Sequence, residues 1–172
     1  LISGEGICPS SLVVKKECLV DVGYFDEKLV SYTDYDMLIK LSDKYLSYIL
    51  PDILFDYQIG NESISKNYYK KFSGKQRILD KYHSLYLRHN ILKYYSKQLS
   101  LLAQYAVLSD KKNNSLRYFL KSIYFNPFQI KSYVSFVVIL IGGKMLYQSC
   151  FFIYYKVRNF IYDLLNIKRI LY

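Results

Sequence analysis

The chain has 172 residues, enough for one ordinary domain or for part of a domain with a helical extension. Its composition is that of a globular protein, with 21 tyrosines, 10 phenylalanines, no tryptophan and a net charge of +10. Cys8, Cys18 and Cys150 have neither a paired spacing nor a nearby histidine pattern, so neither a disulfide framework nor a zinc site is supported. A reducing, cytoplasmic setting fits best.

Charge is distributed unevenly along the chain. Residues 1–64 contain five lysines and eleven acidic residues, a net charge of −6, whereas residues 65–172 contain nineteen basic and three acidic residues, a net charge of +16. This step predicts a domain boundary near Ser65. The basic half matches no nucleic-acid-binding module, so we expect no nucleic acid partner. Two alternatives stay open for it, an anionic membrane surface and an ordinary solvated helical face.

The acidic half begins with a predicted strand. Residues 10–15 are rich in leucine and valine, which favours a short buried strand. Residues 17–22 predict one or two helical turns, because Gly23 follows them as a residue that favours the end of a helix.

A longer helix is predicted over residues 33–44, where apolar side chains recur at helical spacing. Thr33 and Asp36 are spaced as in a capping box, with Asp in the place of Glu. Residues 45–50 and 53–59, on either side of a proline, predict two further short strands.

The basic half is predicted to be helical throughout. Residues 66–97 carry apolar and aromatic side chains at spacings of three and four. Residues 99–127 end in a sequence similar to the second helix of a tetratricopeptide-like hairpin, matched by Phe119, Ser122 and Pro127, with Ser122 in place of the usual alanine. A stable array needs about three such units, so this single hairpin is expected to pack on its neighbours.

Residues 133–155 are the most apolar part of the chain. The uninterrupted run over 134–141 is shorter than the roughly 20 residues that span a bilayer, and Gly142, Gly143 and Lys144 interrupt the longer window. We expect a packed helical hairpin; a hairpin that dips into a membrane is the second alternative, and a spanning helix the third.

Three segments of the acidic half carry a resemblance to a known family. Residues 9–17 read PSSLVVKKE, residues 22–29 read VGYFDEKL, and residues 33–41 read TDYDMLIKL. They resemble the second half of the catalytic domain of glycosyltransferase family 2, in which a strand leads through a short helix to a Gly-Phe-Asp-Glu turn. A helix that opens with an acidic pair then follows. In this chain the pair reads Thr33-Asp34, so its first carboxylate is absent.

The resemblance implies a fold class and two domains. Residues 1–64 would be an α/β fragment, the acceptor-side end of a GT-A-like nucleotide-diphospho-sugar transferase domain. Residues 65–172 would be an all-α region that contains the tetratricopeptide-like hairpin. Because the family holds its nucleotide-sugar donor and its Asp-x-Asp metal motif on an N-terminal half, the chain is expected to be a C-terminal fragment that is inactive alone.

The resemblance also implies a reaction. The intact enzyme would transfer a sugar, with inversion, from a nucleotide-sugar donor to a hydroxyl of a surface glycan or lipid-linked acceptor. Mg²⁺ or Mn²⁺ would assist, bound by ligands outside this fragment. By the resemblance, Asp34 is the general base, and Asp26, Glu27 and Asp36 support the acceptor loop. Separately, the basic and tyrosine-rich composition of residues 65–172 predicts that this region holds the enzyme at the inner face of the cell membrane.

Two alternatives to this assignment stay open. Thr33, Asp34 and Asp36 are also what an ordinary exposed helix N-terminus contains. We do not interpret Asp34 and Asp36 as the metal motif, because side chains two apart on a helix point in different directions. The rival for the whole chain is a non-catalytic helical module that binds a partner protein or a membrane.

Overall fold

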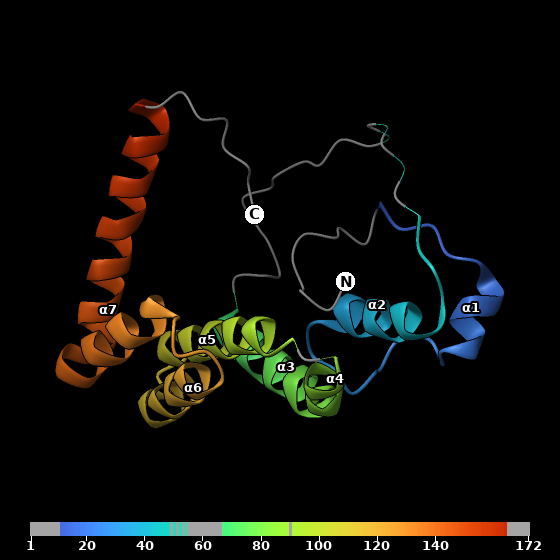
Figure 1. Cartoon of the computed structure of the whole chain (residues 1–172), viewed down its shortest axis with the longest axis horizontal. Coiled ribbons are helices and arrows are strands. Elements are labelled where there is room, and N and C mark those ends of the chain that lie inside the picture. Colours follow the sequence, from blue (N-terminus) through green and yellow to red (C-terminus); the bar gives the residue numbers. More distant parts are fainter. Residues whose placement is uncertain are drawn as a thin grey trace. The chain divides into compact units, whose positions relative to one another are not determined.

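The computed structural model describes residues 11–48, 50, 52, 54, 67–89 and 91–164, with side chains as far as residue 157. The described residues form seven helices (Figure 1): α1 (Lys16–Asp21), α2 (Thr33–Lys44), α3 (Tyr68–Lys81), α4 (His83–Arg88), α5 (Leu92–Leu108), α6 (Lys112–Phe125) and α7 (Ile130–Leu164). The chain divides into two compact units, residues 1–78 and residues 79–172.

The predicted α/β class is wrong, because the described residues contain helices and no strand. Residues 12–15, at the end of the first predicted strand, are irregular, and the side chain of Val13 is 97% exposed. Residues 45–48 are also irregular, and most of the predicted strand over 53–59 lies outside the described residues. Valine-rich runs favour a strand only where a neighbouring strand takes up their backbone hydrogen bonds, and no described segment does so here.

The two helices predicted in the acidic half are present. Helix α1 ends before Gly23, whose φ of 75° lies in the left-handed region that favours glycine. Helix α2 has the predicted bounds, but its capping box does not form. Its N-cap is Tyr32, at φ 65°, and Thr33 is already the first helical residue. The acidic residues of the first turn instead face the positive end of the helix dipole, which stabilises a carboxylate there.

A buried serine network joins three helices of the second unit. The hydroxyls of Ser96 on α5 and Ser122 on α6 each donate to the other residue's carbonyl oxygen at 2.8 Å. Ser122 Oγ is 3.0 Å from Ser132 Oγ on α7, and Gln129 Nε2 donates to the same Ser132 oxygen at 2.9 Å. Only small side chains allow backbones to approach this closely. This explains why a serine can stand at the position where the sequence pattern has alanine.

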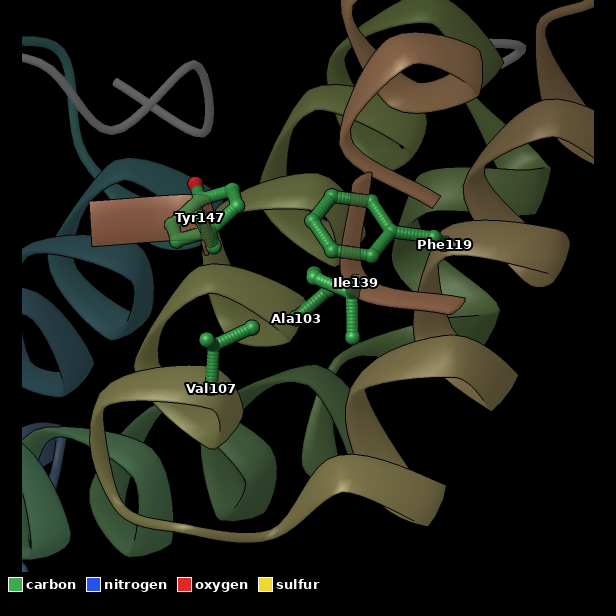
Figure 2. Packing of buried hydrophobic residues seen from close by; sticks show 5 residues of the cluster. All are labelled: Ala103, Val107, Phe119, Ile139 and Tyr147. Carbon is green, nitrogen blue, oxygen red and sulfur yellow. The ribbon is translucent and has the colours of Figure 1, made fainter. Parts of the chain in front are cut away.

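An apolar cluster lies beside this network. Ala103 and Val107 of α5 pack with Phe119 of α6 and with Ile139 and Tyr147 of α7 (Figure 2). Burying a side chain of the size of Phe119 or Ile139 contributes roughly 1.5–3 kcal/mol. The cluster and the serines therefore fix one narrow face of α7 against α5 and α6.

Where a packed helical hairpin was predicted, α7 consists of two helical segments that meet at a kink at Gly143. Gly143 has φ 59° and ψ −150°, a conformation open almost only to glycine, and the chain is helical on both sides of it. Ile130–Val157 is long and apolar enough to cross a membrane, with a mean hydropathy of 1.8. The core helix of a soluble protein passes the same test of length and composition.

The serine network yields a first prediction. Ser96→Ala removes the hydroxyl that donates to Ser122 and contacts Gln129, and it leaves buried acceptors without their donor. We expect the free energy of unfolding to fall by about 1–3 kcal/mol, measured by guanidinium unfolding with circular dichroism. Ser84→Ala, at an exposed position of α4, is the matched control. Equal unfolding midpoints for the two variants would show that the network contributes nothing.

Candidate functional site

The first unit holds its candidate site where the chain enters α2. Ser31 Oγ donates to the backbone oxygen of Lys70 on α3 at 2.7 Å. A Cβ atom on Gly74 would lie only 2.6 Å from the carbonyl oxygen of Ser31, so the glycine permits this approach. The beginning of α2 is thereby held against α3.

Lys75 is buried at this junction, with 2% of its surface exposed. Its ammonium lies 5.0 Å from the ring centroid of Tyr32 and 4.9 Å from that of Tyr35. Burial lowers the pKa of Lys75 to about 8. The two tyrosine faces act in the opposite direction, because the π-electrons of an aromatic ring attract a cation. The site therefore holds an amine whose pKa is lowered by burial to about 8, and perturbed pKa values of this kind occur in functional lysines.

Asp36, predicted to support the acceptor loop, is fully buried and forms a salt bridge with Lys40 at 3.1 Å. The Lys40 ammonium also donates to the carbonyl oxygen of Tyr24 at 3.0 Å. Through Lys40, Asp36 thus connects α2 to the turn that contains the VGYFDEKL sequence. A carboxylate that is buried and paired in this way is unsuited to be a metal ligand, since the metal would have to displace Lys40.

Asp34, the predicted general base, lies in the first turn of α2 and is partly exposed. Its Oδ1 accepts a hydrogen bond from the backbone N–H of Tyr35 at 2.8 Å. Asp26 closes a turn, since its Oδ1 accepts from the backbone N–H of Lys28 at 3.0 Å. Glu27 is exposed. Of the four predicted acids, Asp34 alone combines access to solvent with a place at a helix N-terminus.

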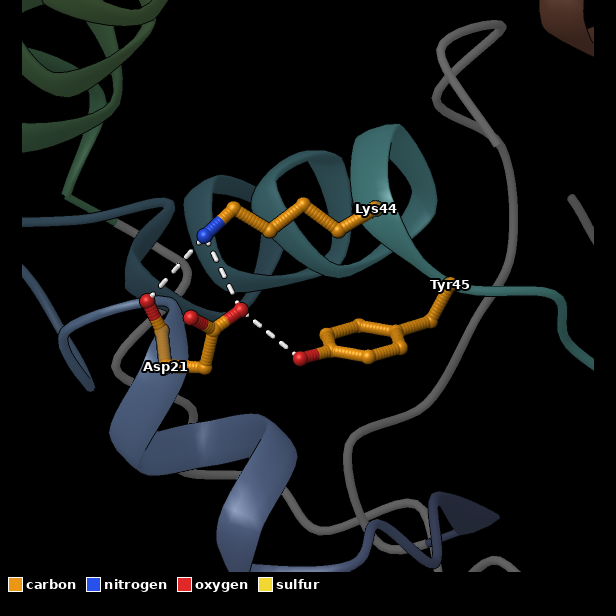
Figure 3. Close-up of polar contacts among 3 residues, drawn as sticks. All are labelled: Asp21, Lys44 and Tyr45. Atoms are coloured by element: carbon orange, nitrogen blue, oxygen red, sulfur yellow. Dashed lines mark hydrogen bonds and ion pairs between the residues drawn. The ribbon is translucent and has the colours of Figure 1, made fainter.

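A further contact, which the sequence did not suggest, joins the ends of α1 and α2 (Figure 3). The Asp21 carboxylate accepts from Lys44 Nζ at 2.9 Å and from the Tyr45 hydroxyl at 2.7 Å. The hydrogen bond from Lys44, followed by that from Tyr45, lowers the pKa of Asp21, and the hydrogen bond to Asp21 raises the pKa of Tyr45 to about 12. The side chains of Lys44 and Asp21 are about half exposed, so this ion pair orients the two helices and contributes little to stability.

No group of three or more histidine, cysteine, aspartate or glutamate side chains placed to hold a metal ion occurs among the described residues. No family model, known protein or solved structure matches the chain. The resemblance to glycosyltransferase family 2 therefore rests on the sequence motifs alone.

The second prediction separates Asp36 from Asp34. Asp36→Asn leaves Lys40 without its buried carboxylate, so we expect the free energy of unfolding to fall by about 1–3 kcal/mol. Asp34→Asn changes a partly exposed residue and should alter it by less than about 0.5 kcal/mol. Guanidinium unfolding of both variants tests this. A larger loss with Asp34→Asn would contradict the assignment of Asp36 as the structural acid.

The third prediction concerns the pH dependence caused by Lys75. Its folded-state pKa of about 8 lies below the ordinary lysine pKa of 10.5, so the unfolded chain binds more protons between these values and stability rises with pH. We expect the free energy of unfolding to rise by roughly 2 kcal/mol between about pH 8 and about pH 9.5. Lys75→Met, which keeps the length of the side chain, should remove this rise. A variant with the same pH profile as the natural sequence would show that Lys75 stays charged.

Proposed function

We propose that the second unit attaches the protein to the surface of an anionic membrane. One observation carries this proposal, the exposure of α7. Only 11% of the most apolar window of Ile130–Val157 is buried, whereas the core helix of a soluble protein is mostly buried. Its exposed apolar side chains include Val137, Ile141, Met145, Phe152 and Ile153. Exposed apolar surface of this extent is typical of a membrane or protein interaction site.

The middle of α7 favours a helix that lies on the membrane over one that spans it. Lys144, near the centre of Ile130–Val157, forms a 2.6 Å salt bridge with Asp110, which follows α5. Tyr147 packs in the cluster with Ala103 and Val107. A spanning helix would carry this ion pair and part of α5 into the bilayer centre, where charged groups are costly.

The basic side chains favour an anionic surface. Residues 65–172 contain nineteen lysines and arginines, and several on separate helices are exposed, including Lys97, Lys112, Arg117, Lys131 and Lys156. Each basic residue close to anionic headgroups contributes about 1 kcal/mol. We place the attachment at the inner face of the cell membrane, because anionic lipid is concentrated in the cytoplasmic leaflet.

The fourth prediction tests this attachment. The full chain should co-sediment with vesicles that contain phosphatidylserine, and the bound fraction should fall as salt screens the charges. Replacing Phe152 and Ile153 by serine should weaken binding at least tenfold, because full burial of each apolar side chain contributes roughly 1.5–3 kcal/mol and about 1.4 kcal/mol already corresponds to a factor of ten. Both side chains are exposed, so the bundle should fold unchanged.

Gln148→Ser, at an exposed position of the same helix, is the matched control and should bind like the natural sequence. Absence of binding at low salt would refute the attachment. If binding did not depend on phosphatidylserine or salt but still required Phe152 and Ile153, the protein would attach by apolar insertion alone and not through an anionic surface.

Glycosyl transfer is the second candidate function, and the placement of Asp34 favours it. The resemblance needs a carboxylate at the opening of a helix that follows the Gly-Phe-Asp-Glu turn, and Asp34 lies in the first turn of α2 with access to solvent. A carboxylate in this position can accept the proton of an attacking hydroxyl. The proposed donor is a nucleotide-sugar, with Mg²⁺ or Mn²⁺ bound by residues outside this chain.

The fifth prediction applies to a form of the protein that turns over a nucleotide-sugar. Asp34→Asn should lower kcat by about two to four powers of ten and leave KM for the donor nearly unchanged, since an amide keeps the shape but accepts no proton. Asp43→Asn, an exposed acid on the same helix, is the control and should be neutral. Equal rates for both variants would remove Asp34 as the base.

A further inference from the structure

The second unit contains a hollow of about 490 Å³, between the end of α3, α4, α5 and the end of α6. Its lining residues combine three aromatic rings with three polar groups: Asp80, His83, Tyr95, Lys121, Tyr124 and Phe125. Its volume falls in the range of small-molecule sites. Neither the membrane-binding helix α7 nor Asp34 contributes to it.

Aromatic rings form one side of this hollow. The ring centroid of Phe125 lies 5.0 Å from that of Tyr95 and 5.3 Å from that of Tyr124, both in edge-to-face arrangement. His83 packs edge-to-face on Tyr95 at 5.3 Å. Tyr95 is buried, whereas 81% of the Tyr124 surface is exposed, so its ring is open to a ligand. The faces of such rings attract cations, quaternary ammonium groups above all.

Asp80 adds a negative charge to the hollow. Its carboxylate has no salt bridge or hydrogen bond among the described residues, although nineteen basic residues occur in residues 65–172. By contrast, Asp110 in the same region is paired with Lys144. Burial raises the pKa of Tyr95 most, and the negative charge of Asp80 raises it further. The free carbonyl groups at the C-terminus of α6, near Phe125, add further negative potential.

Lys121 supplies the opposite charge one helical turn before Phe125. Its ammonium lies 5.8 Å from the ring centroid of Tyr118 and forms no salt bridge with a described residue. The hollow thus offers a carboxylate and ring faces to a cation, and an ammonium to an anion. A purely anionic ligand would meet Asp80, and a simple cation would leave Lys121 unused.

We propose that this hollow binds a phosphocholine-type zwitterion. The quaternary ammonium lies against the exposed ring of Tyr124 near Asp80, and the phosphate faces Lys121. Free phosphocholine and the headgroup of phosphatidylcholine share this chemistry. The site is independent of the proposed attachment to anionic lipid, because it needs no net negative charge on the ligand.

The test is a titration of the full chain with phosphocholine and with choline, followed by NMR chemical shifts and by calorimetry. The natural sequence should bind phosphocholine saturably, with a dissociation constant on the order of a millimolar, because the hollow is open and its cation–π contacts are weak. Asp80→Asn and Tyr124→Leu should each weaken both ligands about tenfold. Lys121→Gln should weaken phosphocholine about tenfold and leave choline unchanged. Asp80, Lys121 and Tyr124 are all exposed, so circular dichroism should show the fold of the natural sequence.

Absence of saturable binding to both ligands would overturn the proposal, as would binding that Asp80→Asn leaves unchanged. If the chain bound N-acetylglucosamine but not phosphocholine, the ligand of the hollow would be a saccharide that stacks on the aromatic rings, and the proposal would also be overturned. Vesicles of phosphatidylcholine alone, at high salt, distinguish the sources. Binding that depends on Asp80 would identify the lipid headgroup, and binding of the free ligand alone would identify a soluble molecule. Neither outcome depends on phosphatidylserine, so failure here is distinguishable from failure of membrane attachment.

Discussion

The reciprocal hydrogen bonds between Ser96 and Ser122 are the constraint on which the second unit depends. Because each hydroxyl donates to the carbonyl of the opposite helix, α5 and α6 are held at a distance that only small side chains allow. Ser132 extends the same network to α7. A buried polar group without its partner costs more than the bond contributes, so the network specifies one packing of the three helices.

This packing also decides which face of α7 stays outside. As far as residue 157, where its side chains are described, the buried ones are Ser132, Ser135, Ile139 and Tyr147, and they occupy a narrow strip of the helix. Phe136, Val138 and Phe151 pack partly against the same cluster, whereas Val137, Ile141, Met145, Phe152 and Ile153 are exposed. Lys144 ties the centre of the helix to Asp110. An apolar helix held at its middle by an ion pair is suited to lie in a membrane surface, since spanning would bury that pair in hydrocarbon.

In the first unit, the corresponding constraint is the approach of Ser31 to α3 beside Gly74. It places Tyr32 and Tyr35 around the Lys75 ammonium. Asp34 lies between these two tyrosines in the sequence, in the first turn of α2. Asp36, two residues later, forms a salt bridge with Lys40, and Lys40 in turn donates a hydrogen bond to the carbonyl oxygen of Tyr24. Asp34 and Asp36 look alike in the sequence, but Asp36 is buried in a salt bridge that supports the fold, whereas Asp34 is accessible to solvent.

The sequence by itself determined the features that depend on local spacing. The apolar period over residues 33–44 predicted the bounds of α2, and the tetratricopeptide-like pattern singled out Phe119 and Ser122, which α6 buries together with Ser115. The strands predicted over residues 10–15 and 45–50 are absent from their described parts, residues 11–15, 45–48 and 50, because β-propensity reports how a residue fits a sheet and not whether a partner strand exists.

Only the tertiary structure decided which distant residues meet. Lys75 between two tyrosines, Asp21 with Tyr45, Ser96 with Ser122, and Asp80 in its aromatic hollow all join separate helices. Contacts of this kind cannot be recognised in a single sequence, because the two residues are far apart in it and neither their types nor their spacing distinguishes them from other pairs. The same holds for the exposed face of α7, because an apolar helix looks alike in sequence whether it is buried or presented to a membrane.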